Sequence, residues 1–352
     1  MKLGFETIGN ATLILYEDGI PVLSTDPWVS GNPYFGSWKH THEIPEPQKS
    51  NINKSKFIWI SHGHPDHLDL DTIKNWDTNK FLISNHFGDR IFNDLTSIGL
   101  QVNKLKDKKW TSLSNNIEIS TFADFNQDSI LMVKMKDVLI IDLNDTNPRG
   151  WSKWIKETAK NFKKVFLLKL TGFGDADMIN YYDENDNFIY PLAEKRIEVG
   201  KTIGHLMESF HANFFIPFSS HHKYQREDSI WANKYTTNLD DYKNGFDNRK
   251  GTLLPAFISY DIDKDNFKKI QTLETNNDII SPKSFNDDWS EPLSKDDEKK
   301  LKDYFLRNEL LKRQIGFIQF TVGEKEYSID INKRKRNKGI LFEVPKDRKS
   351  VV

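Results

Sequence analysis

Short apolar runs bounded by turn residues recur along the front of the chain, and such runs are typical of β-strands. Residues 12–16 and 21–25 are two of them, and Glu17, Asp18 and Gly19 separate them. This spacing predicts a β-hairpin. Further strands are predicted at residues 57–60, 80–84, 117–122, 130–134, 138–141, 165–170 and 214–218.

Helices are predicted in two intervals between strands, which makes the chain an α/β protein. One covers residues 151–162, and the other covers residues 198–211, with Val199, Ile203 and Phe210 on one face. Polar clusters follow four of the strands directly. They are residues 62–67, Asp142, residues 171–175 and residues 219–222. If these strands are neighbours, the clusters converge on one edge of the sheet, where α/β proteins place their sites.

The first cluster, with the sequence HGHPDH at residues 62–67, combines three imidazoles and one carboxylate. Each ring can offer one neutral nitrogen to a divalent cation, and Asp66 adds a hard oxygen. This set suits zinc, iron or manganese better than calcium. The alternative is a histidine-rich solvated turn, and the buried strand predicted in front of the cluster argues against it.

The pattern His-x-His-x-Asp-His after a strand resembles the signature of the metallo-β-lactamase superfamily. The resemblance implies a four-layer αββα sandwich with a two-metal centre at one edge. It also implies that His62 and His64 hold the first metal and that Asp66 and His67 hold the second. A hydroxide shared by the metals would attack the substrate, while Asp66 orients or deprotonates the water.

The same resemblance implies two further ligands at the ends of later strands. An aspartate would bridge the metals; Asp142 is the first choice, and Asp145 is the alternative if the register differs by three. A histidine would complete the second metal, and His222 is chosen over His221. The competing interpretations are a turn aspartate and a surface histidine pair.

Most members of the superfamily supply a third histidine to the first metal, but residues 121–128 contain none. Asp124 or Asp128 could replace it, which would shift the preference from zinc towards iron or manganese. The residues that follow Asp142 resemble the lactamase-like part of CMP-sialic acid hydroxylases. Those hydroxylases also carry a Rieske iron–sulfur domain.

The opening segments resemble another branch, which contains ascorbate-6-phosphate lactonase and the phospholipase that cleaves N-acyl phosphatidylethanolamines. Residues 9–12 and 26–28 carry this likeness, although a histidine more often stands where this chain has Asn10. Asn10 and Asp26 are therefore either part of the metal centre or simple turn residues.

Composition narrows the range of functions. Lys and Arg number 50 against 51 Asp and Glu, so a formal net charge of −1 gives no bulk attraction to nucleic acid. A small anionic substrate then needs a local group of cations, for which Lys223, Arg226 and Arg149 are the candidates. The 352 residues contain no cysteine and cannot hold a Rieske cluster, so hydroxylation would need a separate redox partner.

A shift in composition predicts two regions, residues 1–235 with the metal site and residues 236–352 as a smaller α+β region. In the second region Ser294 is the predicted cap of a helix over residues 295–312. Strands are predicted at residues 317–322, 326–331 and 339–344, with a basic loop at 333–338. Residues 347–352 resemble an adapter-derived tail, which suggests a truncated gene model.

No apolar segment resembles a signal peptide or a membrane span, so we expect a cytoplasmic protein. We interpret the chain as a metal-dependent hydrolase, with zinc as the expected metal. A phosphodiester, a phosphorylated sugar or a nucleotide sugar is the expected substrate. The alternative is a non-hydrolytic substrate-binding partner of a separate Rieske-type oxygenase. The oligomeric state is not predicted.

Overall fold

The chain forms two compact units in a computed structural model. The first comprises Met1–Gln225 and Trp231–Asp278, and the second comprises Arg226–Ile230 and Ile279–Val352. Residues 236–278, which the sequence assigned to the smaller region, thus lie in the first unit. The structure describes residues 1–74, 80–124, 127–148, 150–173, 181–182, 187–195, 197–285, 292–322 and 325–343.

An eight-stranded sheet forms one half of the first unit. The predicted hairpin is present in it as an antiparallel pair of strands, with Ile14 opposite Ser24. From the second strand of this hairpin onward, each neighbouring pair of strands runs parallel. In spatial order its strands are β19 (Asn266–Lys269), β18 (Ile258–Asp261), β1 (Leu3–Ile8), β2 (Thr12–Glu17), β3 (Ile20–Thr25), β5 (Phe57–Ile60), β6 (Phe81–Ile83) and β7 (Val102–Lys104).

A seven-stranded sheet forms the other half. Its strands in spatial order are β17 (Thr252–Leu253), β15 (Phe214–Pro217), β12 (Lys164–Lys169), β11 (Val138–Asn144), β10 (Ser129–Met135), β9 (Glu118–Ala123) and β8 (Thr111–Ser112). The strands β11, β12, β15 and β17 run parallel. The carboxyl ends of β11, β12 and β15 therefore meet at one edge, as predicted for three of the four strands that precede polar clusters. The fourth, β5, precedes the histidine-rich cluster and lies in the other sheet, so the four strands are not neighbours in one sheet.

The largest apolar core lies between the two sheets. Phe5 and Trp59 enter it from the first sheet and Phe166 from the second, all fully buried. The rings of Phe5 and Phe166 meet edge to face at 5.1 Å. Burial of such large rings from both sheets is the main force that holds the halves together.

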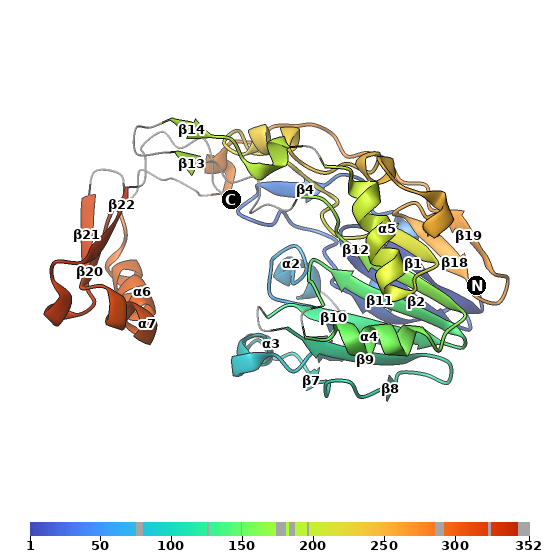
Figure 1. Ribbon diagram of the computed structural model, residues 1–352. Coiled ribbons are helices and arrows are strands. Elements are labelled where there is room, and N and C mark those ends of the chain that lie inside the picture. The colour runs from blue at the N-terminus through green and yellow to red at the C-terminus, as the bar shows by residue number, and fades with distance from the viewer. Residues whose placement is uncertain are drawn as a thin grey trace. The chain divides into compact units, whose positions relative to one another are not determined.

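Helices cover the outer face of each sheet and complete the predicted four-layer αββα sandwich. On the second sheet, α4 (Ser152–Ala159) and α5 (Val199–Phe210) contribute buried apolar residues to one core with β10–β12, and Figure 1 shows them along that sheet. On the first sheet, α3 (Arg90–Ser97) packs on β5 and β6, and α1 (Glu46–Asn53) packs near β2.

Strained turns follow several strands at the edge where the parallel strands end. Asp26 after β3, Asn144 at the end of β11, and Ser219 and Ser220 after β15 all have positive φ angles. Residues other than glycine rarely adopt this conformation, and backbone strain of this kind can mark a functional site. These turns direct the segments after the strands into one region.

In its described residues, the second unit combines two α-helices with a three-stranded sheet. Ser294 caps α6 (Lys295–Leu306) through a capping box with Asp297, as predicted. The predicted single helix is divided, because the Asn308 side chain accepts from two backbone N–H groups and starts α7 (Glu309–Gln314). Strand β20 (Phe317–Val322) lies between β21 (Lys325–Asp330) and β22 (Gly339–Glu343). Residues 347–352 lie outside the described residues.

Two short strands add a separate pair in the first unit, β4 (Trp38–His40) with β16 (His222–Tyr224). A second short pair joins β13 (Tyr181–Tyr182) to β14 (Phe188–Ile189), and the helix α2 (Leu70–Ile73) follows the histidine-rich turn. Among the described residues, no helix has the length and apolar character needed to cross a lipid bilayer.

Candidate metal centre

The HGHPDH segment forms a tight turn directly after β5. Backbone N–H groups of His67 and Leu68 both donate to the carbonyl of His64, at 3.0 and 2.7 Å. The turn brings the three rings together, with His62 centred 4.5 Å from His64 and 4.1 Å from His67. His62 and His67 are buried, while His64 is exposed.

Two groups of side chains in this region can each hold a metal ion. The first is His62, His64 and Asp145, and the second is Asp66, His67 and Asp145; within each group the ligand atoms lie within 4.8 Å of one another. Nε2 of His62 lies 2.8 Å from Nδ1 of His64. Nε2 of His67 lies 3.3 Å from Asp66 Oδ2 and 3.2 Å from Asp145 Oδ2. Asp145 belongs to both groups and is therefore placed to bridge two cations.

Asp26 fixes the orientation of His67. Its Oδ2 accepts from His67 Nδ1 at 2.8 Å, and its two oxygens also accept from the backbone N–H and the hydroxyl of Ser61. Because Asp26 accepts the hydrogen bond from Nδ1, the Nε2 atom of His67 remains available to a metal ion held by the second group. A carboxylate behind a histidine in this way is typical of metal ligands, so the donor set fits a bound cation.

Asp66 is held by two donors from distant parts of the chain. Asn10 Nδ2 donates to Asp66 Oδ2 at 2.9 Å, and the Tyr34 hydroxyl donates to Oδ1 at 2.9 Å. Burial tends to raise the pKa of Asp66, but the charge of His67 outweighs it and lowers the pKa to about 2. Asp66 is therefore ionised and fixed. The role of Asn10 was left open by the sequence, and no sequence pattern marks Tyr34.

Asn10 also connects this carboxylate to the end of β15. Its Oδ1 accepts from the backbone N–H of His221 at 2.8 Å, and its carbonyl accepts from the backbone N–H of Ser219 at 2.9 Å. The amide orientation is thus set by partners on both sides. Asn10 acts as a positioning residue in this arrangement, with no atom in either metal group.

Of the two aspartates considered as substitutes for the missing histidine, Asp128 lies nearer to the first group. Its Oδ1 is 3.8 Å from His62 Nδ1. Burial, together with the neighbouring carboxylates of Asp124 and Asp145, raises the pKa of Asp128 to about 6. Asp124 instead accepts from the Thr146 hydroxyl and from the backbone of Asp128.

Asp142 lies on β11 beside these groups but is a member of neither. Its Oδ1 accepts from the backbone N–H of Asn144 at 3.0 Å, while its buried Oδ2 has no hydrogen-bond partner among the described residues. Burial, reinforced by the nearby charge of Asp26, raises its pKa well above the ordinary value. A bridging role for Asp142 therefore stays a prediction, and the geometry favours Asp145, the alternative register.

Metal binding is expected to compete with a proton on His67. Burial opposes protonation, but the carboxylates of Asp66, Asp145 and Asp26 raise the pKa of His67 well above 6.5. A cation at Nε2 must displace that proton, so metal affinity should rise about tenfold per pH unit until the raised pKa is passed. Calorimetry in buffers of different ionisation enthalpy measures the released proton. An affinity that stays constant between about pH 5 and pH 7 would contradict this.

The raised pKa of His67 also makes the stability of the metal-free fold depend on pH. Because the pKa of His67 is higher in the folded chain, its stabilising contribution is complete below the unfolded value of 6.5. The contribution is lost as pH rises through the raised folded value. Metal and proton therefore stabilise the same cluster in different pH ranges.

No protein-family model matches the sequence. Cytidine monophosphate-N-acetylneuraminic acid hydroxylase from Asterias rubens is 29% identical over 139 residues, which cover 37% of this chain and 21% of the hydroxylase. The chain thus spans about a fifth of that relative's length.

Two solved structures are also similar. Isothiocyanate hydrolase from Delia radicum gut bacteria matches with a TM-score of 0.46 and 14% identity, covering 73% of this chain and 98% of the other. The metallo-β-lactamase fold protein YhfI from Bacillus subtilis matches with a TM-score of 0.38 and 9% identity, covering 72% and 96%. The chain is similar to proteins with the metallo-β-lactamase fold.

The last ligand expected for this fold, His222, lies in β16 and is not a member of either metal group. Its ring stacks on Trp38, with centroids 3.4 Å apart and planes 5° apart. The competing His221 is buried, and its Nε2 faces the carbonyl of Pro217 at 3.2 Å. A role for His222 as a ligand stays a prediction.

The predicted substrate-binding cations of this metallo-β-lactamase-like chain are engaged elsewhere or not described. The Lys223 ammonium donates to the carbonyl of Thr275 and to the side chain of Asn277. Arg226 belongs to the second unit and pairs with Asp228 there. Arg149 lies outside the described residues.

Proposed function

We propose that the chain is a metal-dependent hydrolase for small anionic substrates, such as a phosphodiester, a phosphorylated sugar or a nucleotide sugar. The observation that carries the proposal is the shared carboxylate: the two metal groups meet at Asp145. When bound there, a pair of divalent cations lowers the pKa of water towards neutrality and polarises a phosphoryl or acyl oxygen. Zinc fits the histidines, and the oxygen-rich surroundings also suit iron or manganese.

The residues around the cations have distinct tasks in this proposal. Asp66 is fixed by Asn10 and Tyr34 and stays ionised, so it can accept a hydrogen bond from the attacking water and orient it. Asp26 holds the tautomer and direction of His67. Burial of His67 and Asp66 limits access of bulk water to this half of the centre.

A cavity of about 410 Å³ next to the first group supplies a place for the substrate. His62 and His64 line it together with Phe87 and Arg90. The Phe87 side chain is 87% exposed, and Arg90 is paired only loosely with Asp94, at 3.6 Å on the surface. Such an exposed pair contributes little, so we propose that Arg90 can turn to an anionic group while Phe87 contacts an adjoining apolar part.

Replacement of His64 by alanine tests the proposed function. The variant should lose metal from the first group, and hydrolysis should fall by more than roughly 100-fold, since even an outer partner of a ligand typically changes affinity 10–100-fold. Metal analysis and assays on phosphodiester, lactone and nucleotide-sugar substrates measure both effects. His205→Ala, an exposed histidine on α5, is the matched control and should change neither. A purified chain with less than one metal ion, or activity that survives in His64→Ala, would refute the proposal.

The match to the Asterias rubens hydroxylase supports a second candidate. In this second candidate function, the chain binds a nucleotide sugar for a separate Rieske-type oxygenase and does not hydrolyse the sugar nucleotide. Incubation in the presence of dioxygen with CMP-sialic acid, a Rieske protein and an electron donor distinguishes the two candidate functions. A hydroxylated product that requires both added components, with no hydrolysis by the chain alone, favours this candidate.

A further inference from the structure

A second and larger cavity, of about 790 Å³, lies in the first unit. No member of the two metal groups lines it. Its floor includes residues 253–257, the short crossover that leads from β17 of one sheet to β18 of the other. The volume lies within the range of about 300–1,000 Å³ that small-molecule sites occupy.

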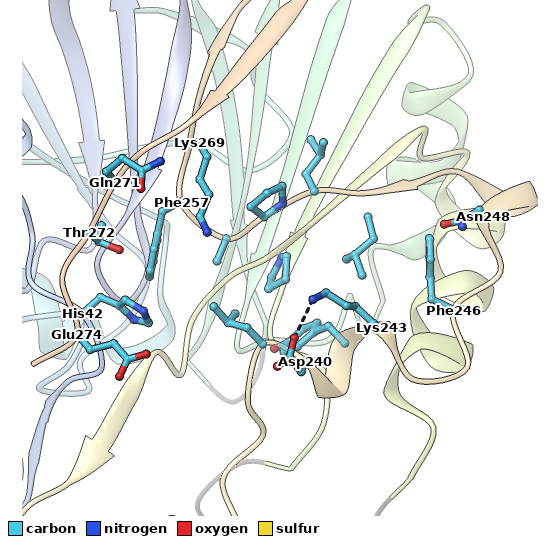
Figure 2. Close-up of a pocket in the computed structure, with 17 residues that line it drawn as sticks. His42, Asp240, Lys243, Phe246, Asn248, Phe257, Lys269, Gln271, Thr272 and Glu274 are labelled. Carbon is cyan, nitrogen blue, oxygen red and sulfur yellow. Dashed lines mark hydrogen bonds and ion pairs between the residues drawn. The ribbon is translucent and has the colours of Figure 1, made fainter. Parts of the chain in front are cut away.

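Two lysines place ammonium groups at this cavity. Figure 2 shows Lys269 and Lys243 extending into it from different walls. Lys269, at the end of β19, makes no ion pair with a described residue. Lys243 is paired with Asp240 at 2.7 Å, but both side chains are largely exposed. Because exposed pairs of this kind are weak, Lys243 is also available to an anionic ligand.

Two carboxylates, Asp240 and Glu274, also line the cavity, so the positive charge is local to the lysines, while neutral groups add donors. His42 is half-buried, and burial lowers its pKa, so the ring is neutral near pH 7. Glu274 lies beside His42 at one end, away from Lys243 in Figure 2. The side chains of Gln271 and Thr272 face the cavity without a hydrogen bond to any described residue. These amide and hydroxyl groups can donate to oxygens.

The apolar side chains that line the cavity are fixed by packing against their neighbours. Phe257 is 5% exposed and meets the rings of His42 and His221 edge to face, at 5.3 and 5.4 Å. Phe246 and Leu254 line the same space. A flat apolar or aromatic group can therefore pack against side chains that are already ordered, which reduces the entropic cost of binding.

We propose that this cavity is a second ligand site, for a small molecule that carries an anionic head on an aromatic or apolar body. The two ammonium groups hold the head, and the Phe257 side of the cavity holds the body. A carboxylate and a phosphate share the chemistry that the lysines recognise. Ligand binding at this site does not require a metal ion. It can therefore be tested separately from the proposed hydrolase function.

Binding to the metal-stripped full chain tests the proposal by calorimetry. The probes are naphthyl phosphate, naphthoate, naphthol and inorganic phosphate. We expect one or both of the naphthalene anions to bind, and whichever binds more tightly identifies the head group. Naphthol and inorganic phosphate should each bind at least tenfold more weakly, because each lacks one half of the recognised structure.

A matched pair of variants locates the binding. Lys269→Gln should weaken the naphthalene anion about tenfold, consistent with loss of one charged hydrogen bond. Lys268→Gln, on the same strand but with its side chain on the opposite face, should have no effect. The His64→Ala variant should bind the probe normally. Equal effects of the two lysine variants, naphthol binding as tight as the anions, or loss of binding in His64→Ala would overturn the proposal.

Discussion

Replacement of Asp145 by asparagine is expected to impair both metal groups at once. Its carboxylate is the one ligand that the two groups share, with Oδ2 3.2 Å from Nε2 of His67. Asparagine keeps the size of the side chain but offers a neutral oxygen, which binds two cations far more weakly. Metal content should fall below one ion per chain, and hydrolysis should drop roughly 1,000-fold or more.

Asp142→Asn is the matched comparison for this experiment. Asp142 lies on β11, three residues before Asp145 in the turn that follows, is buried, and is the other aspartate that the sequence offers as the bridge. If Asp145 bridges, the Asp142 variant should retain more metal and more activity than the Asp145 variant. If the Asp142 variant instead loses more metal and more activity than the Asp145 variant, Asp142 is the bridging ligand. Thermal melting with a chelator present shows whether each variant folds without metal.

Replacement of Asp26 by asparagine should weaken metal binding about 10–100-fold, although Asp26 is a member of neither group. The charge behind His67 Nδ1 is lost, so the imidazole becomes a poorer donor and its orientation is less restricted. The pKa of His67 in the metal-free chain should also fall, because one of the carboxylates that raise it is gone. Competition with a chelating dye measures the affinity, and NMR titration of His67 measures the pKa.

Asp69→Asn is the control for removing a buried carboxylate charge that does not lie behind His67. Asp69 is also buried, but it caps α2 by accepting from the backbone of Asp71 and Thr72. Asparagine is an equally good helix cap, so this variant should bind metal normally. An Asp26 variant that binds metal as tightly as the Asp69 variant would show that the carboxylate behind His67 is dispensable.

The sequence predicted the elements that depend on local patterns. The hairpin of β2 and β3, the helices α4 and α5, the cap at Ser294 and the strands β5, β6, β9 to β12 and β15 follow from residue types within a few positions. The strands β1, β7, β8 and β17 to β19 were not predicted. The four-layer arrangement was predicted from the resemblance to the metallo-β-lactamase superfamily. The histidine-rich turn was identifiable because six adjacent residues carry its chemistry.

Features that depend on pairing between distant segments were harder to predict. The register shifts between Asp142 and Asn144 where β11 meets β12, and this irregularity turns the chain so that Asp145 joins the metal groups. The strands β17, β18 and β19 look like part of a polar C-terminal region, yet β17 pairs with β15, and β18 pairs with both β1 and β19. Tyr34 reaches Asp66 from a loop of unusual backbone geometry, which no sequence pattern marks.

The bond from Asn10 to the backbone of His221 joins positions 211 residues apart. Contacts of such long sequence separation form late in folding, because a large loop must close first. The carboxylate of Asp66 therefore reaches its final position only after the first strand and the end of β15 have both joined the sandwich. Metal ions should consequently enter a nearly finished protein, and a ribosome-bound chain that has not yet released residue 221 should be unable to load them.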